Sequence, residues 1–582
     1  MNWRKPFVLT LGLVGIVGML PLLVVAAPQA GPRASEKLDA SLVASLESGA
    51  SDFVIVFSEQ ADLSPAYSMG WEERGRFVYD SLRKIAESSQ SQAKLELDRQ
   101  GLTYRTFIAG NELYVVSGSL TAANEVAGLA EVSRVRSAGT YYIEPLVESQ
   151  PELQTSSGAL AWGIADTQAD EFWATFGVQG EGVVVANIDS GVQWDHPALD
   201  QAYRCGSDSE DPDCWEDPSN ICGGAMCDNN GHGTHTMGTM VGDDDDSLVW
   251  KAGMAPGAEW IACKGCEYNS CSDFALSACA DWVLAPGNDP DNRPHIVNNS
   301  WGGDGCNSWY RDKVIAWRAA GIFPAFSAGN NTYSCNSLGS PGDYAESFST
   351  TGHSSTRDHY GSRGPSWCFG HTPYTKPNIS GPAVSVCSSV PGNQWDCSYT
   401  GTSMASPHSA GAVALLWSCN PGLVGQMDAT FEALQDSADT ASGGVCGAPP
   451  DGEGNYTSGY GFLNVYEAGL ASCLPWVTGE IEGYVRESGS GDPIQGAYVV
   501  ANPDDSRWKP IRTGTNEAGY YRMEVAVGTH QIIVNTNVHH AEVVSGINVD
   551  EDQVVPQDFY LVHLNDWCAQ FTCFYLPAIA KH

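Results

Sequence analysis

Three residues of this chain, Asp189, His232 and Ser403, stand in an order and in surroundings that suit nucleophilic catalysis. A serine hydroxyl is a poor nucleophile at neutral pH, so it needs an imidazole that accepts its proton. A carboxylate that accepts a hydrogen bond from this imidazole fixes its tautomer and stabilises its cation. We therefore predict that Asp189, His232 and Ser403 form a catalytic triad for acyl transfer.

The elements that must position these side chains are also visible in the sequence. Residues 183–188 form an apolar run typical of a buried parallel strand, and Asp189 follows at its carboxyl end. That edge is where open α/β sheets carry their sites. A glycine turn at His232 predicts the start of a helix. Ser403 precedes the apolar run 405–417, so we expect it at a helix N-terminus, where free N–H groups favour negative charge.

A fourth residue, Asn330, follows the small-residue turn Ala328-Gly329. Attack on a carbonyl creates an oxyanion that needs preorganised donors. We expect the Asn330 amide to be one donor and the backbone N–H of Ser403 to be the other. One such segment alone would be weak evidence for catalysis, since an aspartate after a strand is usually a turn residue.

Two nearby histidines and one serine are predicted to be packing residues rather than catalytic ones: His235, His408 and Ser406.

At these residues the chain resembles the subtilisin family (subtilase) of serine proteases. The resemblance covers roughly residues 160 to 440 and includes long strings besides the short motifs. It implies a peptidase domain over 159–474, with an α/β fold in which helices flank a subtilisin-like parallel sheet. The matching strings are Gly180–Ala186, His196–Leu199, Met254–Ala262, Val297–Gly303 and Trp317–Pro324.

The resemblance also implies substrate-binding residues. Ser300, Trp301 and Gly302 match the edge segment that pairs with extended substrate backbone. Gly339 matches the floor of the primary specificity pocket, which implies tolerance for large uncharged side chains. Between Asp189 and His232, however, an acidic stretch with four cysteines departs from the family pattern. This stretch is expected to be an added loop that reshapes the cleft.

The N-terminus and the cysteines indicate export. Residues 1–27 combine Arg4 and Lys5 with an apolar run, which is typical of a signal peptide, with an uncleaved anchor as the alternative. Eighteen cysteines, an even number, favour disulfides in an oxidising compartment. Connectivity cannot be fixed from sequence; Cys222–Cys227 and Cys387–Cys397 are the pairs suggested. A zinc site at Cys263, Cys266 and Cys271 is the alternative. We expect a secreted, extracellular protein, with cell-surface association also open.

The formal net charge of −40, from 29 basic and 69 acidic residues, argues against nucleic acid or an anionic membrane as a partner. The densest carboxylate run is Asp243–Asp246, which could supply calcium ligands or form a solvated acidic loop. Many subtilases bind structural calcium, so the resemblance implies calcium somewhere. No cofactor is expected for catalysis, and the metal ligands are not predicted.

The region 50–146 has the order of an α+β fold: strand, long helical stretch, strands, short helix, strand. It resembles the inhibitor I9-like propeptide of subtilases, a ferredoxin-like fold that acts as an intramolecular inhibitor. The polar segment 144–158 would then be the processing linker. The alternative is an independent binding domain.

The region 479–562 alternates short strands with Gly, Asp and Asn turns, which predicts an all-β sandwich. Its pattern resembles the carboxypeptidase regulatory-like domain. We expect it to contact insoluble substrates or the cell surface. Residues 563–582 form an aromatic tail of undetermined role.

Two classes of function remain. The favoured one is a secreted serine endopeptidase, made as a zymogen, that acts on protein or peptide substrates. The other is a surface adhesion or scaffolding protein whose subtilase domain is inactive and whose sandwich is the working part.

Overall fold

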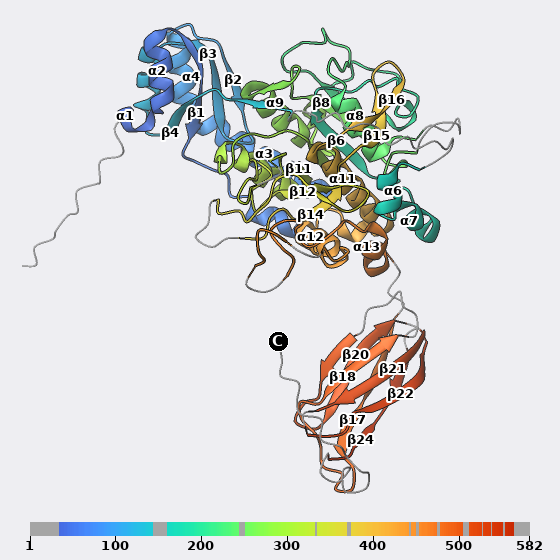
Figure 1. Cartoon of the computed structure of the whole chain (residues 1–582). Coiled ribbons are helices and arrows are strands. Elements are labelled where there is room, and N and C mark those ends of the chain that lie inside the picture. The colour runs from blue at the N-terminus through green and yellow to red at the C-terminus, as the bar shows by residue number, and fades with distance from the viewer. Residues whose placement is uncertain are drawn as a thin grey trace, which may run out of the picture.

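The structure is a computed structural model in which three domains follow one another along the chain, the first two packed against each other (Figure 1). Its described residues are 34–143, 160–243, 251–331, 334–368, 374–441, 444–449, 453–473, 478–503, 511–526, 528–536, 538–550 and 553–563. The predicted signal peptide and linker lie outside them, as does the predicted tail from residue 564 on. Of the residues described, no helix combines the length and apolar composition needed to cross a bilayer.

The N-terminal domain is an antiparallel sheet of four strands in the order β2-β3-β1-β4, covered by helices. Strand, helix, two strands, helix and strand follow one another, so the predicted ferredoxin-like order is confirmed. The sequence did not predict the two short helices that precede the first strand. The elements are α1 (Ala34–Lys37), α2 (Ala40–Ser48), β1 (Ser51–Phe57), α3 (Trp71–Ser89), α4 (Ser91–Arg99), β2 (Tyr104–Phe107), β3 (Glu112–Gly118), α5 (Leu120–Ala127), β4 (Val132–Ser137) and β5 (Thr140–Tyr142).

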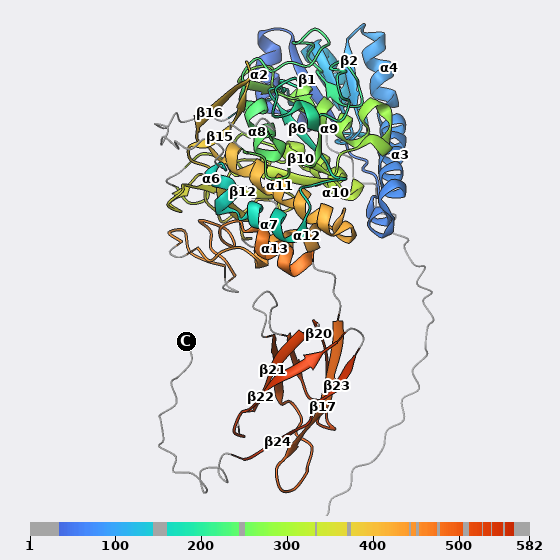
Figure 2. The same ribbon diagram turned by 90° about the vertical axis from the view of Figure 1, so that its right-hand side faces the viewer.

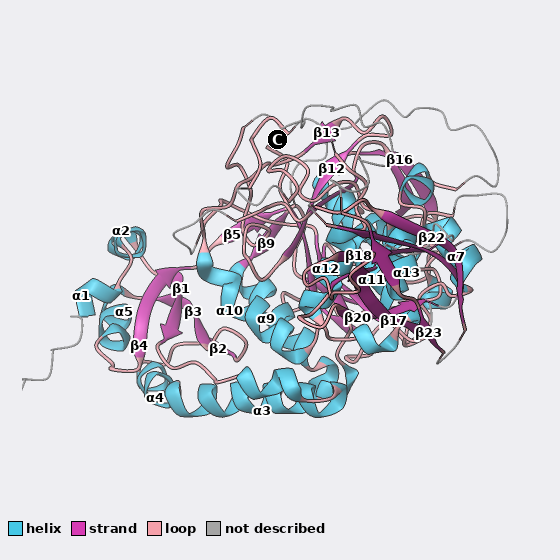
Figure 3. Ribbon diagram, turned by 90° about the horizontal axis from the view of Figure 1, so that it is seen from below, coloured by secondary structure: helices cyan, strands magenta, loops and turns pink. Residues whose placement is uncertain are grey.

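Helix α3 extends beyond this sheet and lies along the central domain (Figure 3). Near its N-terminus the Arg74 guanidinium is buried and donates to three backbone carbonyls of the central domain, those of Arg318, Ala319 and Gly425. Trp71 stacks on His295 with ring centroids 4.5 Å apart. Because a buried guanidinium needs such acceptors, these contacts fix the end of α3 on the central domain.

The central domain is built on one sheet in the order β13-β12-β11-β10-β6-β8-β7, in which β14 also pairs with β12. All neighbours are parallel except β12 and β13. Helices α8 and α11 pack on each other and on the sheet, as do α9 and α10 (Figure 2). This is the predicted α/β fold with flanking helices. The strands are β6 (Val184–Asp189), β7 (Trp215–Glu216), β8 (Glu259–Lys264), β9 (Ser270–Ser272), β10 (Ile296–Asn299), β11 (Phe323–Ser327), β12 (Phe348–His353), β13 (His359–Tyr360), β14 (Ile379–Pro382), β15 (Val386–Val390) and β16 (Gln394–Tyr399). The helices are α6 (Trp162–Asp166), α7 (Ala169–Phe176), α8 (His232–Val241), α9 (Asp273–Leu284), α10 (Arg311–Ala320), α11 (Thr402–Cys419), α12 (Met427–Asp436) and α13 (Val465–Ser472).

The cysteine-rich stretch between Asp189 and His232 was expected to be an added loop, but part of it forms a strand of the central sheet. It contributes β7, which adds a parallel edge strand beside β8, with Trp215 opposite Ala262. Trp215 is buried, so this stretch extends the sheet and its core.

The C-terminal domain consists of two small sheets with an apolar layer between them, as the predicted sandwich requires. Alternate residues of β17 and β18, such as Ile481 and Val499, are buried in that layer. Figure 1 shows this domain apart from the other two domains. Its strands are β17 (Thr478–Glu487), β18 (Tyr498–Pro503), β19 (Ile511–Gly514), β20 (Tyr520–Ala526), β21 (Gly528–Asn535), β22 (Glu542–Val549), β23 (Val554–Pro556) and β24 (Phe559–Leu561).

Candidate active site

Asp189 and His232 meet at the carboxyl edge of the central sheet. Asp189 is the last residue of β6, and His232 is the first residue of α8. The His232 Nδ1 lies 2.7 Å from Asp189 Oδ1, and both side chains are buried. The same carboxylate accepts from the backbone N–H of Ser190 at 2.7 Å and from the Thr236 hydroxyl at 3.3 Å. Since a carboxylate only accepts, Nδ1 must carry the proton of this hydrogen bond, which leaves Nε2 as the ring nitrogen available to Ser403.

Ser403 is the second residue of α11, as predicted, and lies at the N-terminus of this long buried helix. Its hydroxyl donates to the backbone carbonyl of Ser300 at 3.2 Å. The Nε2 of His232 is buried and has no hydrogen-bond partner among the residues described. The structure therefore joins Asp189 to His232 but holds the Ser403 hydroxyl on a different acceptor. Catalytic hydrogen bonds are often long or misaligned before substrate binds.

The Asn330 side-chain amide lies against the start of α11, and hydrogen bonds to Thr402 fix its orientation. Its Oδ1 accepts from the backbone N–H of Thr402 at 2.8 Å and from the Thr402 hydroxyl at 3.0 Å. Its Nδ2 is buried and has no partner in the part of the chain that the structure describes. A Cβ at Gly401 would lie 3.3 Å from this nitrogen, so a glycine there keeps the donor uncovered. Thr402 thus fixes which end of the amide is available for an oxyanion.

The predicted substrate-binding edge follows β10 directly. Ser300 is tied to the triad region, because its hydroxyl donates to the Ser403 carbonyl at 2.9 Å. Gly302 exchanges two backbone hydrogen bonds of 3.2 Å with Tyr142 of the N-terminal domain. The Trp301 side chain is buried among Tyr310, Phe326 and other aromatic rings. Trp301 can therefore contact a substrate only through its backbone.

Gly339 lines a cavity of about 340 Å³ beside this edge. A Cβ on Gly339 would come within 2.9 Å of the Gly303 carbonyl, so the close approach of the two segments requires glycine. The cavity wall includes Asp304 and Asp343. Asp343 is buried, and its Oδ2 accepts from the Cys306 N–H at 2.6 Å. Burial raises the pKa of Asp343.

Two residues that the sequence analysis missed support the pair Asp189–His232. Asp228 accepts from the Ser190 hydroxyl and from the backbone N–H groups of Asn230, Gly231 and Thr234. Lys264 is buried at the end of β8 and donates to the Ser190 carbonyl and to Asn229. Burial lowers the pKa of Lys264. The signal available in the sequence was the Asp228-Asn-Asn-Gly string, which is typical of an Asx turn.

The side chains predicted to be packing residues have other partners. His235 Nε2 contacts the Val386 carbonyl at 3.0 Å, and burial lowers the pKa of His235 to about 3. His408 Nδ1 lies 2.8 Å from the Met404 carbonyl, one helical turn away. Burial lowers the pKa of His408 to about 4. The Ser406 hydroxyl donates to Asn298 at 2.8 Å. The pKa shifts keep both histidines neutral.

The described cysteines are all joined in disulfides. Both suggested pairs are present, and the zinc alternative is wrong, because Cys263 and Cys266 bond to Cys279 and Cys271. Cys568 and Cys573 lie outside the described residues. The pairs are Cys205–Cys214, Cys222–Cys227, Cys263–Cys279, Cys266–Cys271, Cys306–Cys368, Cys335–Cys446, Cys387–Cys397 and Cys419–Cys473.

The predicted acidic run is described only at Asp243, which pairs with Lys251 at 3.0 Å; the other three aspartates lie outside the described residues. Among the residues described, Cys306, Asp343 and Cys368 gather three potential metal ligands. The two cysteines are bonded to each other, which removes them as ligands. This group therefore does not fit a metal ion.

The parallel sheet with a histidine–aspartate pair at its carboxyl edge places the central domain in the α/β class. A family model described as "Subtilase family" matches residues 180–461, and one described as "Carboxypeptidase regulatory-like domain" matches residues 480–562. Subtilisin BL of Lederbergia lenta is 30% identical over 275 residues, which cover 45% of this chain and 86% of that protein. The chain belongs to the subtilase family.

Two further similarities extend this comparison. Bacillopeptidase F of Bacillus subtilis (strain 168) is 38% identical over 361 residues, 59% of this chain. The chain spans only 24% of the length of that protein. The crystal structure of fervidolysin from Fervidobacterium pennivorans, a keratinolytic enzyme related to subtilisin, aligns with a TM-score of 0.51 at 16% identity. That alignment covers 88% of this chain and 78% of fervidolysin, and it supports the fold.

Proposed function

We propose that this chain is a secreted serine endopeptidase made as a zymogen. The observation that carries the proposal is the backbone pairing of Tyr142 with Gly302. This pairing places an extended peptide segment along the edge that contains Ser300 and Gly302. The Ser300 carbonyl accepts a hydrogen bond from the Ser403 hydroxyl, so this edge lies next to the proposed nucleophile. A peptide bound in this way runs beside the nucleophile, as strand addition requires.

In the proposed reaction Ser403 Oγ turns from the Ser300 carbonyl to His232 Nε2 and gives up its proton as it attacks the scissile carbonyl. Asp189 keeps the ring in the tautomer with Nδ1 protonated and stabilises the imidazolium. The oxyanion accepts hydrogen bonds from Asn330 Nδ2 and from the N–H of Ser403, the latter helped by the α11 dipole. His232 then protonates the leaving amine, and water hydrolyses the acyl-enzyme by the reverse route. No step needs a cofactor.

The N-terminal domain is proposed to be the propeptide. Its strand β5 lies between β9 and Gly302, pairing antiparallel with residues Ser270–Ser272. While this segment stays bound, no substrate backbone can occupy the same edge. Cleavage in the segment 144–158 would separate the inhibitor from the peptidase.

Four further assignments are proposed with it. Disulfides across the central domain support export to an oxidising compartment. The C-terminal sandwich is proposed to contact insoluble substrates or the cell surface. Structural calcium is proposed as well, with no ligand set assigned. At the cavity beside Gly339 we propose that large uncharged side chains of the substrate are tolerated.

The test is labelling with an organophosphonate probe, which reacts with an activated serine. Purified wild-type protein should be labelled on Ser403 and should cleave a chromogenic peptide. The matched variant Ser403→Ala should lose both properties and should keep its N-terminal domain attached. Absence of labelling and of hydrolysis in correctly folded wild type, after an added protease has cut the segment 144–158, would favour the adhesion or scaffolding alternative.

A further inference from the structure

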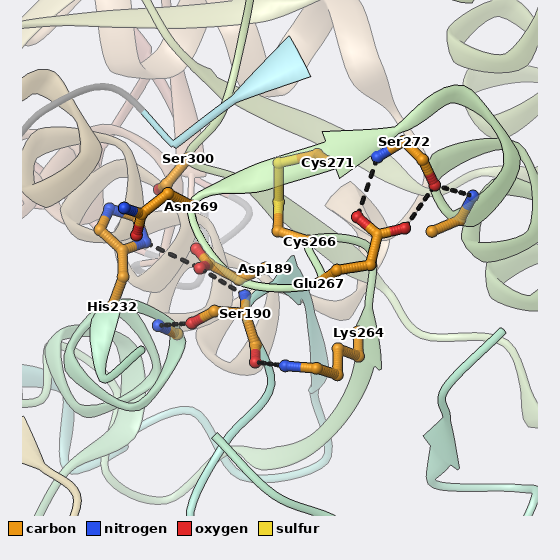
Figure 4. The surroundings of a disulfide bond; sticks show 12 residues. Asp189, Ser190, His232, Lys264, Cys266, Glu267, Asn269, Cys271, Ser272 and Ser300 are labelled. Carbon is orange, nitrogen blue, oxygen red and sulfur yellow. Dashed lines mark hydrogen bonds and ion pairs between the residues drawn. A yellow bond between two sulfur atoms is a disulfide. The ribbon is translucent and has the colours of Figure 1, made fainter. Parts of the chain in front are cut away.

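The loop between β8 and β9 is closed by the disulfide Cys266–Cys271, next to the candidate triad (Figure 4). Cys266 follows the end of β8, and its backbone N–H donates to the Asp189 carbonyl at 3.0 Å. Cys271 is the middle residue of β9. Both side chains are fully buried. The disulfide therefore connects the strand that lies beside Asp189 to the strand that pairs with β5.

Glu267 makes a second set of ties within the same loop. Its Oε2 accepts from the backbone N–H of Ser272 at 3.1 Å, and its Oε1 accepts from the Ser272 hydroxyl and from Ser219 at 2.9 Å. Its own N–H donates to the Ser270 carbonyl at 2.9 Å. The carboxylate thus holds the far end of β9 while the disulfide holds its middle.

The residues held in this way are the ones that contact the extended segment of the N-terminal domain. Tyr141 lies opposite Cys271 in the antiparallel ladder, and Ile143 donates its N–H to the Asn269 carbonyl at 3.1 Å. On its other side β5 pairs with Gly302. Strand β9 is only three residues long, so pairing within its own sheet contributes little to its order.

We propose that the Cys266–Cys271 disulfide is a positioning device that holds β9 in register to receive the backbone of an extended peptide substrate. The inference rests on the proposed endopeptidase function. If β9 is ordered before the substrate binds, binding does not carry the entropic cost of ordering this strand. The disulfide is therefore expected to increase the affinity for an extended peptide. The acyl-transfer chemistry depends on residues that β9 does not supply.

The test compares a long with a minimal substrate. In the full chain, Cys266→Ser/Cys271→Ser should raise KM for a tetrapeptide p-nitroanilide about tenfold, because β9 must then be ordered on binding. We expect kcat to change by less than about twofold, since ordering affects binding and chemistry separately. Hydrolysis of p-nitrophenyl acetate, which has no backbone to pair with β9, should stay close to wild type.

The control is Cys205→Ser/Cys214→Ser, which removes another short-range disulfide, of sequence separation 9, outside the β9 loop. It should leave the ratio of the two activities unchanged. Equal losses on both substrates in the Cys266/Cys271 variant, or no loss on either, would overturn the inference. If wild type hydrolyses neither substrate, the proposed function fails instead.

A measurement that does not depend on activity tests the inference even if wild type hydrolyses neither substrate. In the full chain carrying Ser403→Ala, β5 stays paired with β9 and takes the place of the extended substrate. Amide hydrogen exchange of residues 269–272 should be faster without Cys266–Cys271 than in the control, and equal rates would overturn the inference. If the double variant does not fold, Cys266→Ala/Cys271→Val replaces it. That variant also lacks the disulfide, fills the buried positions with apolar side chains and should shift exchange in the same direction.

Discussion

Arg136 of β4 forms a buried ion pair with Asp273, the first residue of α9, across the boundary between the N-terminal and central domains. The same guanidinium lies 3.2 Å from Glu112, which in turn pairs with Lys313 of α10 at 2.7 Å. All four side chains are buried. Each domain therefore contributes one cation and one carboxylate to this buried cluster, and each of the four charges has a partner in the other domain.

The first prediction concerns this interface. Arg136→Ala leaves Asp273 and Glu112 without that partner, and breaking such a buried pair typically costs about 3–5 kcal/mol. We expect the N-terminal domain to dissociate faster after processing, measured as earlier appearance of peptidase activity. Arg134→Ala is the control, because Arg134 lies on the same strand and makes an exposed pair with Asp39. Equal time courses for both variants would contradict the prediction.

The second prediction concerns pH. Asp281 of α9 accepts the backbone N–H groups of Ile108 and Ala109, each at 2.8 Å. Burial raises the pKa of Asp281 to about 7, although these N–H groups and the charge of Lys313 act in the opposite direction. The folded pKa lies above the usual value of about 3.9, so this group's contribution to stability is complete below about pH 4. It is lost as the pH rises through about 7.

An asparagine side chain carries no charge at any of these pH values, so Asp281→Asn should gain stability over its parent as the pH rises from about 5 to about 8. The measurement is the difference in Tm between the two proteins, both carrying Ser403→Ala to prevent processing. Asp436→Asn on the exposed face of α12 is the control substitution. A Tm difference that does not vary with pH would show that Asp281 is not the titrating group.

How far the sequence predicts this molecule depends on the range of the interactions involved. The placement of Asp189, His232 and Ser403 follows from local patterns: an apolar run before the aspartate, a glycine before the histidine, a helical run after the serine. The pairing of Cys335 with Cys446 depends on segments 111 residues apart meeting in the fold, which no local pattern encodes. The antiparallel pairing of β5 with β9 was not predictable for the same reason.

The third prediction concerns the oxyanion donor. Asn330→Ala should lower kcat about 10²–10³-fold, as loss of such a donor does in subtilisin, with little change in KM. The donor acts on charge that develops near the transition state, so ground-state binding is not affected. Asp189→Asn, which favours the wrong histidine tautomer, should also lower kcat severely. The measurement is kcat and KM of each variant on one chromogenic peptide. A change confined to KM for Asn330→Ala would mean that Asn330 only binds substrate.

The fourth prediction concerns the C-terminal domain. Cys419–Cys473 closes the end of the central domain, so a chain that ends after Cys473 retains every disulfide described here. We expect this truncated protein to mature and to cleave short chromogenic peptides at near wild-type rates. Its binding to an insoluble protein should be lost. If it folds, by circular dichroism, yet fails on the short peptide, then the sandwich belongs to the active unit.

Strand β5 belongs to the same chain as the edge with which it pairs, and this has a consequence for the proposed activation. A tethered segment meets its site at an effective concentration in the ~mM range, whatever the amount of protein present. Once the connecting chain is cut, occupancy depends on the actual concentration of the two pieces. A concentrated preparation should then remain inhibited after processing, whereas the same preparation should become active when it is diluted.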